Sequence, residues 1–411
     1  MVKICDAIMG TGKSSAAITY MNSHPEKRFI YITPYLGEVT RICHECSSMM
    51  FYEPLKVGKF KWSKTLHTAE LVRRGCNIAT THQAFRYYSK ELLEAVRARN
   101  YTLIIDEDVN VLETVDEEPG IIKMVMDAGY IKQSGNDIYH LVKDDYKGET
   151  FKDLFQTLRQ RDIIRVGSRQ KDCLYYWLLP PELITSFEDV FVLTYRFRGQ
   201  SLYHFFEMYK IPYEYIGVER DKDGAYHFGK VGGYIPTYVK TLKEKINIVD
   251  EYKLNAVGDK QYSLSKSWFA RKGDEVERLR KNLYNYFHNV NSDFSASDKM
   301  WGTFEGAKYS LRGKGYTNGF VAFNKRATNE YSNRRVLAYC INIYMNVGQK
   351  LFYQSNNIEV DDDEYALSTM VQWIWRSAIR NGEEIRLYVP SKRMRELLQN
   401  WIEEVNNYEC V

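Results

Sequence analysis

Residues 7–14, with the sequence AIMGTGKS, have the spacing of a loop that binds nucleotide phosphates: a small residue, four spacers and Gly-Lys-Ser. Glycines let backbone N–H groups wrap around phosphate oxygens without obstruction by side chains. Lys13 is expected to reach the outer phosphates, and Ser14 to offer its hydroxyl to a magnesium ion. The residues expected to bind the nucleotide are Gly10, Thr11, Gly12, Lys13 and Ser14.

A second set of residues suited to chemistry follows about ninety residues after the loop. The apolar run of residues 101–105 reads as a buried strand that places Asp106 and Glu107 at its carboxyl end, where open parallel sheets bind ligands. Asp106 is expected to hold Mg²⁺, and Glu107 to orient and deprotonate the water that attacks the γ-phosphate. The two groups together predict hydrolysis of ATP with Mg²⁺ as cofactor.

A third group lies near the end of the chain. We expect Gln372, Arg376 and Arg380 on one helix, with the two arginines four residues apart and therefore on one face. Such a pair could clamp a γ-phosphate from an opposite domain. A solvated basic face is the alternative, and the phosphate loop favours the catalytic role, so these three residues join Lys13 and Glu107 as catalytic candidates.

Alternating strands and helices must position these residues. Short apolar strands are expected at residues 2–5, 29–34, 76–82, 101–106 and 190–194, with helices at 15–21, 36–50 and 83–99. Strands that alternate with helices imply a parallel sheet with crossover helices. Residues 51–75 are basic, and phosphate contact or a solvated loop explains them equally well.

The remaining chain divides into an insertion and a second α/β region. Residues 110–185 interrupt the pattern, with an expected hairpin at 131–142 and a helix at 151–162. The second region shows strands at 245–250, 319–323 and 384–389, and helices at 274–287, 333–345 and 392–406. The acidic run 361–364 is expected to start the helix that carries the late arginines.

Composition narrows the class of protein. The chain has 411 residues, 57 basic and 53 acidic, which gives a net charge of +4 and does not require a nucleic-acid partner. It has no apolar run long enough to cross a membrane. Seven cysteines in so long a chain suit a reducing compartment, and Cys43 and Cys46 are expected to pack on a helix rather than bind zinc.

In this order the motifs resemble those of superfamily 2 helicases of the DEAD/DEAH type, and the segments KSWF, GFVAFNKRATNEY and QWIWRSAIR look like bacteriophage-encoded DNA helicases. The resemblance covers most of the chain outside residues 110–185. It implies an α/β protein with two RecA-like P-loop domains, the first at residues 1–199, a linker region at 200–245 and the second at 246–411. ATP would bind in the cleft and single-stranded nucleic acid across the top.

The resemblance also implies roles for strand-end residues. Positions matching those that contact the nucleic-acid backbone, or that couple its binding to hydrolysis, are Thr33, Pro34, Thr80, Thr81, Thr194, Thr328 and Asn329. Three departures from the family pattern stand out. Trp375 replaces a glycine and the last arginine comes one residue late, so the finger is either Arg376 or Arg380. Motif III reads Thr194-Tyr195-Arg196, and no glutamine motif for adenine precedes Ala7.

We therefore expect an ATP-dependent helicase or translocase acting on single-stranded or forked DNA, with RNA as an alternative substrate. Its setting would be phage replication or recombination in the cytoplasm of an infected cell, with proteins of those pathways as partners. Two alternatives stay open: a terminase-like packaging ATPase, which would need clustered carboxylates beyond Asp361–Glu364, and a nucleotide-dependent nucleic-acid binding or loader protein without unwinding activity.

Overall fold

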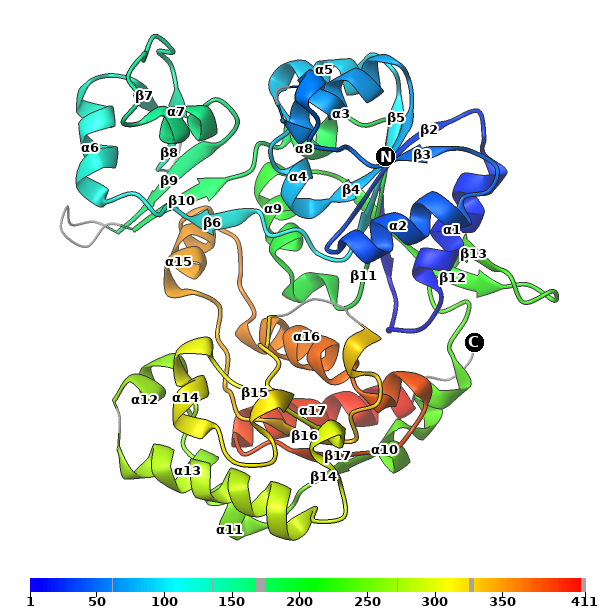
Figure 1. Cartoon of the computed structure of the whole chain (residues 1–411), viewed down its shortest axis with the longest axis vertical. Coiled ribbons are helices and arrows are strands. Elements are labelled where there is room, and N and C mark those ends of the chain that lie inside the picture. Colours follow the sequence, from blue (N-terminus) through cyan, green and yellow to red (C-terminus); the bar gives the residue numbers. More distant parts are fainter. Residues whose placement is uncertain (61, 135–136, 168–173, 272, 325–328, 408–411) are drawn as a thin grey trace. The chain divides into compact units, whose positions relative to one another are not determined.

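The computed structural model describes residues 1–60, 62–134, 137–167, 174–271, 273–324 and 329–407. The chain forms two compact units (Figure 1). The first unit comprises Met1–Ile8, Gly12–Tyr234 and Asn346–Val360, and the second comprises Met9–Thr11, Ile235–Met345 and Asp361–Val411. No helix of the described residues is both long and apolar enough to cross a membrane.

The first unit is built on an eight-stranded sheet in the order β13-β12-β1-β11-β5-β2-β4-β3. Every neighbouring pair is parallel except β12 and β13. Its strands are β1 Val2–Asp6, β2 Arg28–Thr33, β3 Phe51–Tyr52, β4 Asn77–Thr81, β5 Tyr101–Asp106, β11 Asp189–Thr194, β12 Tyr213–Arg220 and β13 Tyr226–Gly229. This is the expected parallel α/β architecture.

Burial explains why these runs form strands. In β5 the first five residues are all buried, as are the last five of β2, because helices cover both faces of a parallel sheet. The core on one side joins Ala16, Ala17 and Met21 of a helix to Tyr31 and Ile104 of the sheet. The helices of this sheet are α1 Lys13–Ser23, α2 Leu36–Glu45, α3 Lys64–Arg73, α4 His82–Phe85, α5 Lys90–Arg97, α8 Glu182–Thr185 and α9 Ser201–Tyr209.

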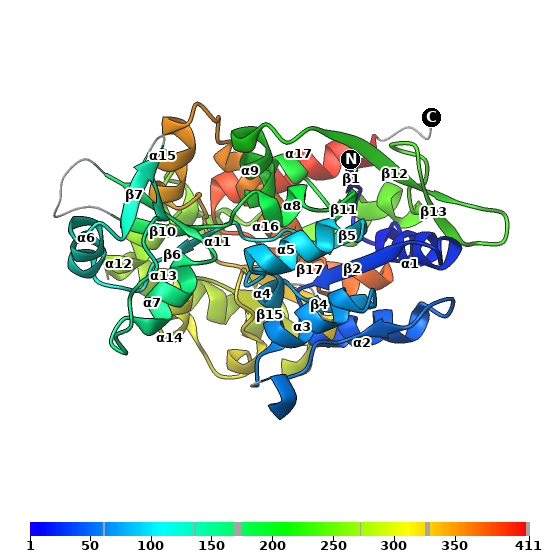
Figure 2. The same cartoon turned by 90° about the horizontal axis from the view of Figure 1, so that it is seen from above.

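The insertion between β5 and β11 has a sheet and a core of its own (Figure 2). Its five antiparallel strands, in the order β6-β10-β9-β8-β7, are β6 Leu112–Thr114, β7 Ile131–Ser134, β8 Ile138–Leu141, β9 Asp162–Val166 and β10 Leu174–Leu178. Its helices are α6 Pro119–Asp127 and α7 Lys152–Leu158. The expected hairpin and helix are therefore present, although the Gly-Asn turn at 135–136 lies outside the described residues.

A segment from late in the chain belongs to the first unit. Helix α15 (Val347–Ser355) is preceded by Asn346, whose Oδ1 accepts hydrogen bonds from the N–H groups of Gly348 (2.9 Å) and Gln349 (3.3 Å). The same oxygen accepts a hydrogen bond from the Tyr176 hydroxyl of β10 at 2.8 Å. One side chain therefore both caps α15 and ties it to the insertion.

The second unit contains a four-stranded parallel sheet in the order β14-β17-β16-β15. Its strands are β14 Ile246–Ile248, β15 Lys299–Gly302, β16 Val336–Tyr339 and β17 Ile385–Tyr388. Its helices are α10 Leu242–Lys245, α11 Tyr252–Asn255, α12 Lys266–Ala270, α13 Asp274–Asn285, α14 Lys308–Leu311, α16 Asp362–Ile374 and α17 Lys392–Asn406. Trp268, Leu279 and Trp301 lie in the core beside this sheet.

Several expected elements differ in the structure. The expected helix at 333–345 is the strand β16, because a strand paired on both sides and buried on both faces has a continuous apolar run without alternation. The expected strand at 319–323 is reduced to one bridge from Phe320 to Trp301. The expected helix at 83–99 is two helices, with Ser89 capping the second.

The expected linker at 200–245 also differs. Most of it is regular structure of the first unit, because β12 pairs in parallel with β1 and α9 precedes it. The first unit therefore continues to Tyr234 rather than ending near residue 199.

The double role of Asn346 gives a testable prediction. In Tyr176→Phe the cap of α15 persists and one hydrogen bond is lost, so amide exchange in α15 should be faster by about fivefold, which corresponds to ~1 kcal/mol. In Asn346→Ala both interactions are lost and the increase should be larger. Hydrogen exchange read by mass spectrometry measures both, with the exposed Tyr262→Phe as control; equal exchange in all four proteins would contradict the tie.

Candidate nucleotide-binding site

The candidate site lies at the carboxyl edge of the first sheet, where parallel strands end side by side. The register places Asp6 opposite Thr194, and Leu193 opposite Asp106. The loop that follows β1 begins there, since the Ala7 N–H donates to the Thr194 carbonyl at 3.1 Å. Three adjacent strands, β1, β11 and β5, therefore bring the phosphate loop and the acidic pair to one edge.

The loop has the backbone that its glycines predict. Gly10 and Gly12 have φ angles of 81° and 85°, a left-handed conformation that a side chain would strain. Helix α1 begins directly afterwards at Lys13, whose ammonium donates to the carbonyls of Ala7 (2.5 Å) and Ile8 (3.1 Å). Burial lowers the pKa of Lys13, while nearby acidic groups, including Asp106, oppose the shift. The ammonium is thus held inside the loop.

Asp106 is the most constrained carboxylate of the site. Its Oδ1 accepts a hydrogen bond from the Ser14 hydroxyl at 3.3 Å, and its Oδ2 accepts one from the Tyr31 hydroxyl at 2.9 Å. Burial, and next the negative charge of Glu107, raise the pKa of Asp106 to about 7, while the bond from Tyr31 acts in the opposite direction. A cation beside this carboxylate would compensate the desolvated charge.

Glu107 occupies a strained position. Its φ is 67°, in the left-handed region that residues other than glycine rarely adopt. Its N–H donates to the Leu193 carbonyl at 2.9 Å, so pairing with β11 helps hold this conformation. Backbone strain of this kind clusters at functional sites, where the surrounding structure enforces it.

The donor chemistry at this edge fits Mg²⁺ with a nucleotide. Ser14 and Asp106 offer a hydroxyl and a carboxylate, which are hard oxygen ligands, and Mg²⁺ usually takes one or two protein ligands together with phosphates and waters. Among the described residues there is no group of three or more His, Cys, Asp or Glu side chains that could hold a metal. Ser14 and Asp106 therefore suit a site in which Mg²⁺ is also bound by the phosphates of a ligand.

Three supporting residues escaped the sequence analysis. Both carboxylate oxygens of Asp6 accept backbone N–H groups that follow β11, from Arg196 (2.7 Å) and Phe197 (3.0 Å). The Thr194 hydroxyl donates to Gln200 Oε1 at 2.6 Å. The third is Tyr31, whose one signal was a tyrosine within an otherwise apolar strand, because a buried hydroxyl needs a partner.

The residues expected to contact nucleic acid separate into buried and accessible ones. Thr33 and Thr80 are 0% and 2% exposed, which disfavours direct contact of their side chains with nucleic acid. Pro34 and Thr81 are partly exposed, and the Thr81 hydroxyl accepts the Ala84 N–H at the start of α4. Thr194 is buried. Thr328 lies outside the described residues, and Asn329 begins a short 3-10 turn, Asn329–Tyr331.

The structure corrects the placement of the late arginines in the second unit. Helix α16 carries Gln372 but ends at Ile374. Arg376 follows the helix, and Arg380 lies in a 3-10 turn, Ala378–Asn381, so the two do not share a helical face. Arg376 is 4% exposed, whereas Arg380 is exposed. After the helix, the N–H groups of Arg376 and Ser377 donate to the carbonyls of Trp373 and Ile374 in a tighter turn.

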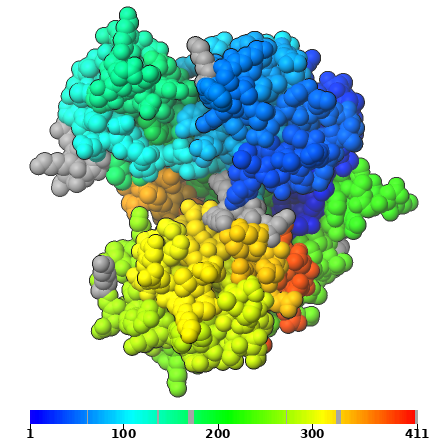
Figure 3. Space-filling model, in the orientation of Figure 1, coloured from blue at the N-terminus to red at the C-terminus, as the bar shows by residue number. Residues whose placement is uncertain are grey.

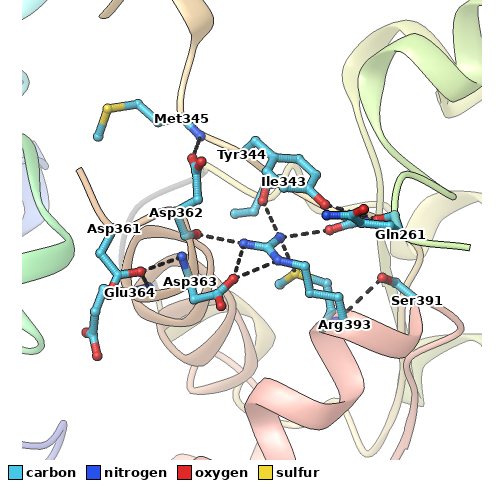
Figure 4. Close-up of polar contacts among 12 residues, drawn as sticks. Gln261, Ile343, Tyr344, Met345, Asp361, Asp362, Asp363, Glu364, Ser391 and Arg393 are labelled. Atoms are coloured by element: carbon cyan, nitrogen blue, oxygen red, sulfur yellow. Dashed lines mark hydrogen bonds and ion pairs between the residues drawn. The ribbon is translucent and has the colours of Figure 1, made fainter. Parts of the chain in front are cut away.

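The acidic run at the start of α16 has structural partners (Figure 4). Asp361 caps the helix by accepting the N–H groups of Asp363 (2.8 Å) and Glu364 (3.0 Å). Asp362 accepts the Met345 N–H at 2.9 Å, and Asp363 pairs with Arg393 at 2.6 Å. The run is therefore the expected helix start, and these contacts argue against the nuclease centre that a packaging ATPase would need. Cys43 of α2 packs against the core of the first unit, and Cys46, which directly follows that helix, is buried in it.

Comparisons with known proteins add a family. Residues 240–402 match the family described as the YonV C-terminal Rossmann-like domain. The SPbeta prophage-derived protein YonV of Bacillus subtilis (strain 168) is 37% identical over 413 residues, which cover 98% of each chain.

Two solved structures show weaker likeness. The structure of S. tokodaii Xpd4 has a TM-score of 0.48 and 11% identity, covering 97% of this chain and 94% of that one. The DUF1998 helicase MrfA bound to DNA has a TM-score of 0.30 and 10% identity, covering 98% of this chain and 46% of that one. Identity with the prophage protein along nearly the whole of both chains gives the firmer result: this chain belongs to the YonV family.

Proposed function

We propose that this protein hydrolyses ATP with Mg²⁺ and uses the energy to move along or unwind nucleic acid, as a superfamily 2 type helicase or translocase. The observation that carries the ATPase proposal is the juxtaposition of Lys13, Ser14 and Asp106 at one edge of the first sheet, with the Ser14 hydroxyl on the Asp106 carboxylate. The left-handed glycines of the loop support it, because they turn backbone N–H groups toward a phosphate.

Each residue of the edge has a proposed role. Lys13 neutralises charge on the outer phosphates, and Ser14 and Asp106 would hold Mg²⁺, which supplies a Lewis acid to the phosphates. Glu107 orients the attacking water and accepts its proton. Tyr31 and Asp6 are positioning residues, one for Asp106 and the other for the backbone after β11. The roles of Gln372, Arg376 and Arg380 stay predictions, which single-turnover hydrolysis by alanine variants would separate.

DNA is the proposed nucleic acid, and phage replication or recombination the proposed setting. The support is the prophage origin of the YonV relative, together with the helicase-like order of motifs in the sequence. Pro34 and Thr81 are the proposed backbone contacts, since both lie at strand ends of the same carboxyl edge and are partly exposed.

Replacing the loop lysine tests the ATPase. Lys13→Ala should lower turnover by about 10²–10³-fold, because preorganised charge at the phosphates contributes most of the rate. Phosphate release measured with Mg²⁺ and ATP gives the rate, and the exposed Lys90→Ala serves as control. Turnover close to that of the unmodified protein in Lys13→Ala would reject the site.

Asp106 makes stability depend on pH in the absence of divalent ions. Because its pKa in the folded protein, about 7, lies above the unfolded value near 3.8, the folded state favours the neutral acid, and stability falls as pH rises from 3.8 to about 7 and then levels off. Asp106→Asn should therefore raise the melting temperature at pH 8 by at least about 3 °C and change it less at pH 5. Melting curves in EDTA measure this, with the exposed Asp145→Asn as control; an equal change at both pH values would contradict the buried charge.

The motor proposal predicts a response to nucleic acid. Single-stranded DNA should raise the ATPase rate several-fold, and a forked duplex should be separated with ATP but not with a non-hydrolysable analogue. Parallel assays with single-stranded, duplex and forked DNA and RNA measure both effects. Binding without strand separation or stimulation would instead favour the loader alternative, and a rate indifferent to every nucleic acid would reject the motor.

A further inference from the structure

The β12–β13 hairpin extends beyond the carboxyl edge on which the phosphate loop begins. Strand β1 pairs with β12 up to Cys5 opposite Ile216, but β12 continues to Arg220. At about 3.3 Å per residue, Arg220 lies roughly 10 Å past the level of Gly217, the residue after that last pair. Figure 1 and the space-filling view of Figure 3 show this hairpin standing out from the first unit beside α1. The far end of the hairpin therefore lies near the start of α1, where the phosphate loop ends.

The hairpin is a rigid support. Its turn is closed by Asp221, whose N–H donates to the Ala225 carbonyl at 2.9 Å and whose Oδ1 accepts the N–H groups of Asp223 (3.0 Å) and Ala225 (2.8 Å). The Arg220 side chain donates from Nε to the Gly224 carbonyl at 3.2 Å. Side chains on this hairpin are therefore held in place before any ligand arrives.

Tyr226 brings an aromatic ring directly onto the phosphate loop. A Cβ built on Gly12 would lie 2.4 Å from Cδ1 of Tyr226, so the ring occupies the space beside the loop backbone. Tyr226 is partly exposed and pairs with Arg220 across the hairpin. The Arg220 guanidinium lies 5.4 Å from the centre of that ring and 5.8 Å from the ring of Tyr234, and the two rings are 5.6 Å apart.

Tyr226 packs against the core of the first unit, as Phe228 does, and both residues keep some exposed surface. Phe228 stacks on Phe191, whereas Tyr226 lies at the end of β13 next to the loop. A flat ring reinforced by a guanidinium offers a stacking surface for a planar heterocycle. A nucleotide whose phosphates lie on the loop carries such a heterocycle one ribose away.

We propose that Tyr226 and Arg220 form the base-stacking subsite for the purine of the nucleotide whose phosphates bind the loop. The subsite rests on the proposed nucleotide-binding function and names the part of the ligand beyond the phosphates. Stacking recognises the face of the base rather than its hydrogen-bonding edge, so this subsite favours purines over pyrimidines and distinguishes adenine from guanine only weakly.

Two ligands separate the base from the phosphates. The full-length protein is titrated with Mg²⁺–ATP and with Mg²⁺–tripolyphosphate, which has neither base nor ribose. Tyr226→Leu keeps an apolar side chain without a π-face, and should raise the Kd for ATP by roughly tenfold while leaving the Kd for tripolyphosphate unchanged. Tyr226→Phe keeps the ring and should stay within about twofold of the unmodified protein for both ligands.

A neighbouring residue provides the matched control. His227 is on the same strand, is exposed and pairs with Asp221, so His227→Ala tests whether any change in the hairpin affects binding. Equal loss of both ligands in Tyr226→Leu, or no loss of either, would overturn the subsite while the nucleotide site itself stands. A loss of single-stranded DNA binding instead of ATP binding would also overturn it. Failure of the unmodified protein to bind either ligand would reject the proposed function and the subsite together.

Discussion

The desolvation of Asp106 is the constraint around which the first unit is organised. A carboxylate at the end of a strand buried on both faces is costly unless it has donors, and here the donors are hydroxyls from two other elements, Ser14 of α1 and Tyr31 of β2. The negative charge of Glu107 repels the ionised form of Asp106 and raises its pKa further. The strand order β1-β11-β5-β2 places both hydroxyls within hydrogen-bonding distance of Asp106. The stabilisation of this buried carboxylate therefore depends on the topology of the sheet.

The strands on either side of Asp106 each contribute in a different way. Strand β11 accepts the Glu107 N–H and supplies Thr194, whose hydroxyl is bound by Gln200 in the connection to α9. That connection is anchored a second time by Asp6 at the end of β1. The phosphate loop and the acidic pair are therefore linked through one turn, residues 194–200.

The alternation of strands and helices in the sequence predicted the parallel α/β fold, although single elements differ. Lys13, Ser14, Asp106 and Glu107 could be proposed as site residues because their chemistry dictates residue type and spacing, and the strands before them are continuous apolar runs. The strand β16 could not be predicted, since a fully buried strand and a buried helix have the same composition. Arg376 and Arg380 were misplaced because no glycine or proline marks the end of α16, and the turn after it is held partly by a long-range hydrogen bond from the Ala378 N–H to the Arg334 carbonyl. The partners of Asp106 and Thr194 come from long-range packing, which a sequence read alone does not reveal.

The capping of α15 by Asn346 has a consequence for how the chain can be divided. The family match at residues 240–402 is continuous in sequence, yet it contains Asn346–Val360, which belongs to the first unit and contacts the insertion through Tyr176. A fragment limited to residues 240–402 would contain α15 without the strand β10 that it contacts. A fragment ending at Tyr234 would contain β10 without α15. The region that matches one family model is thus divided between the two compact units of the structure.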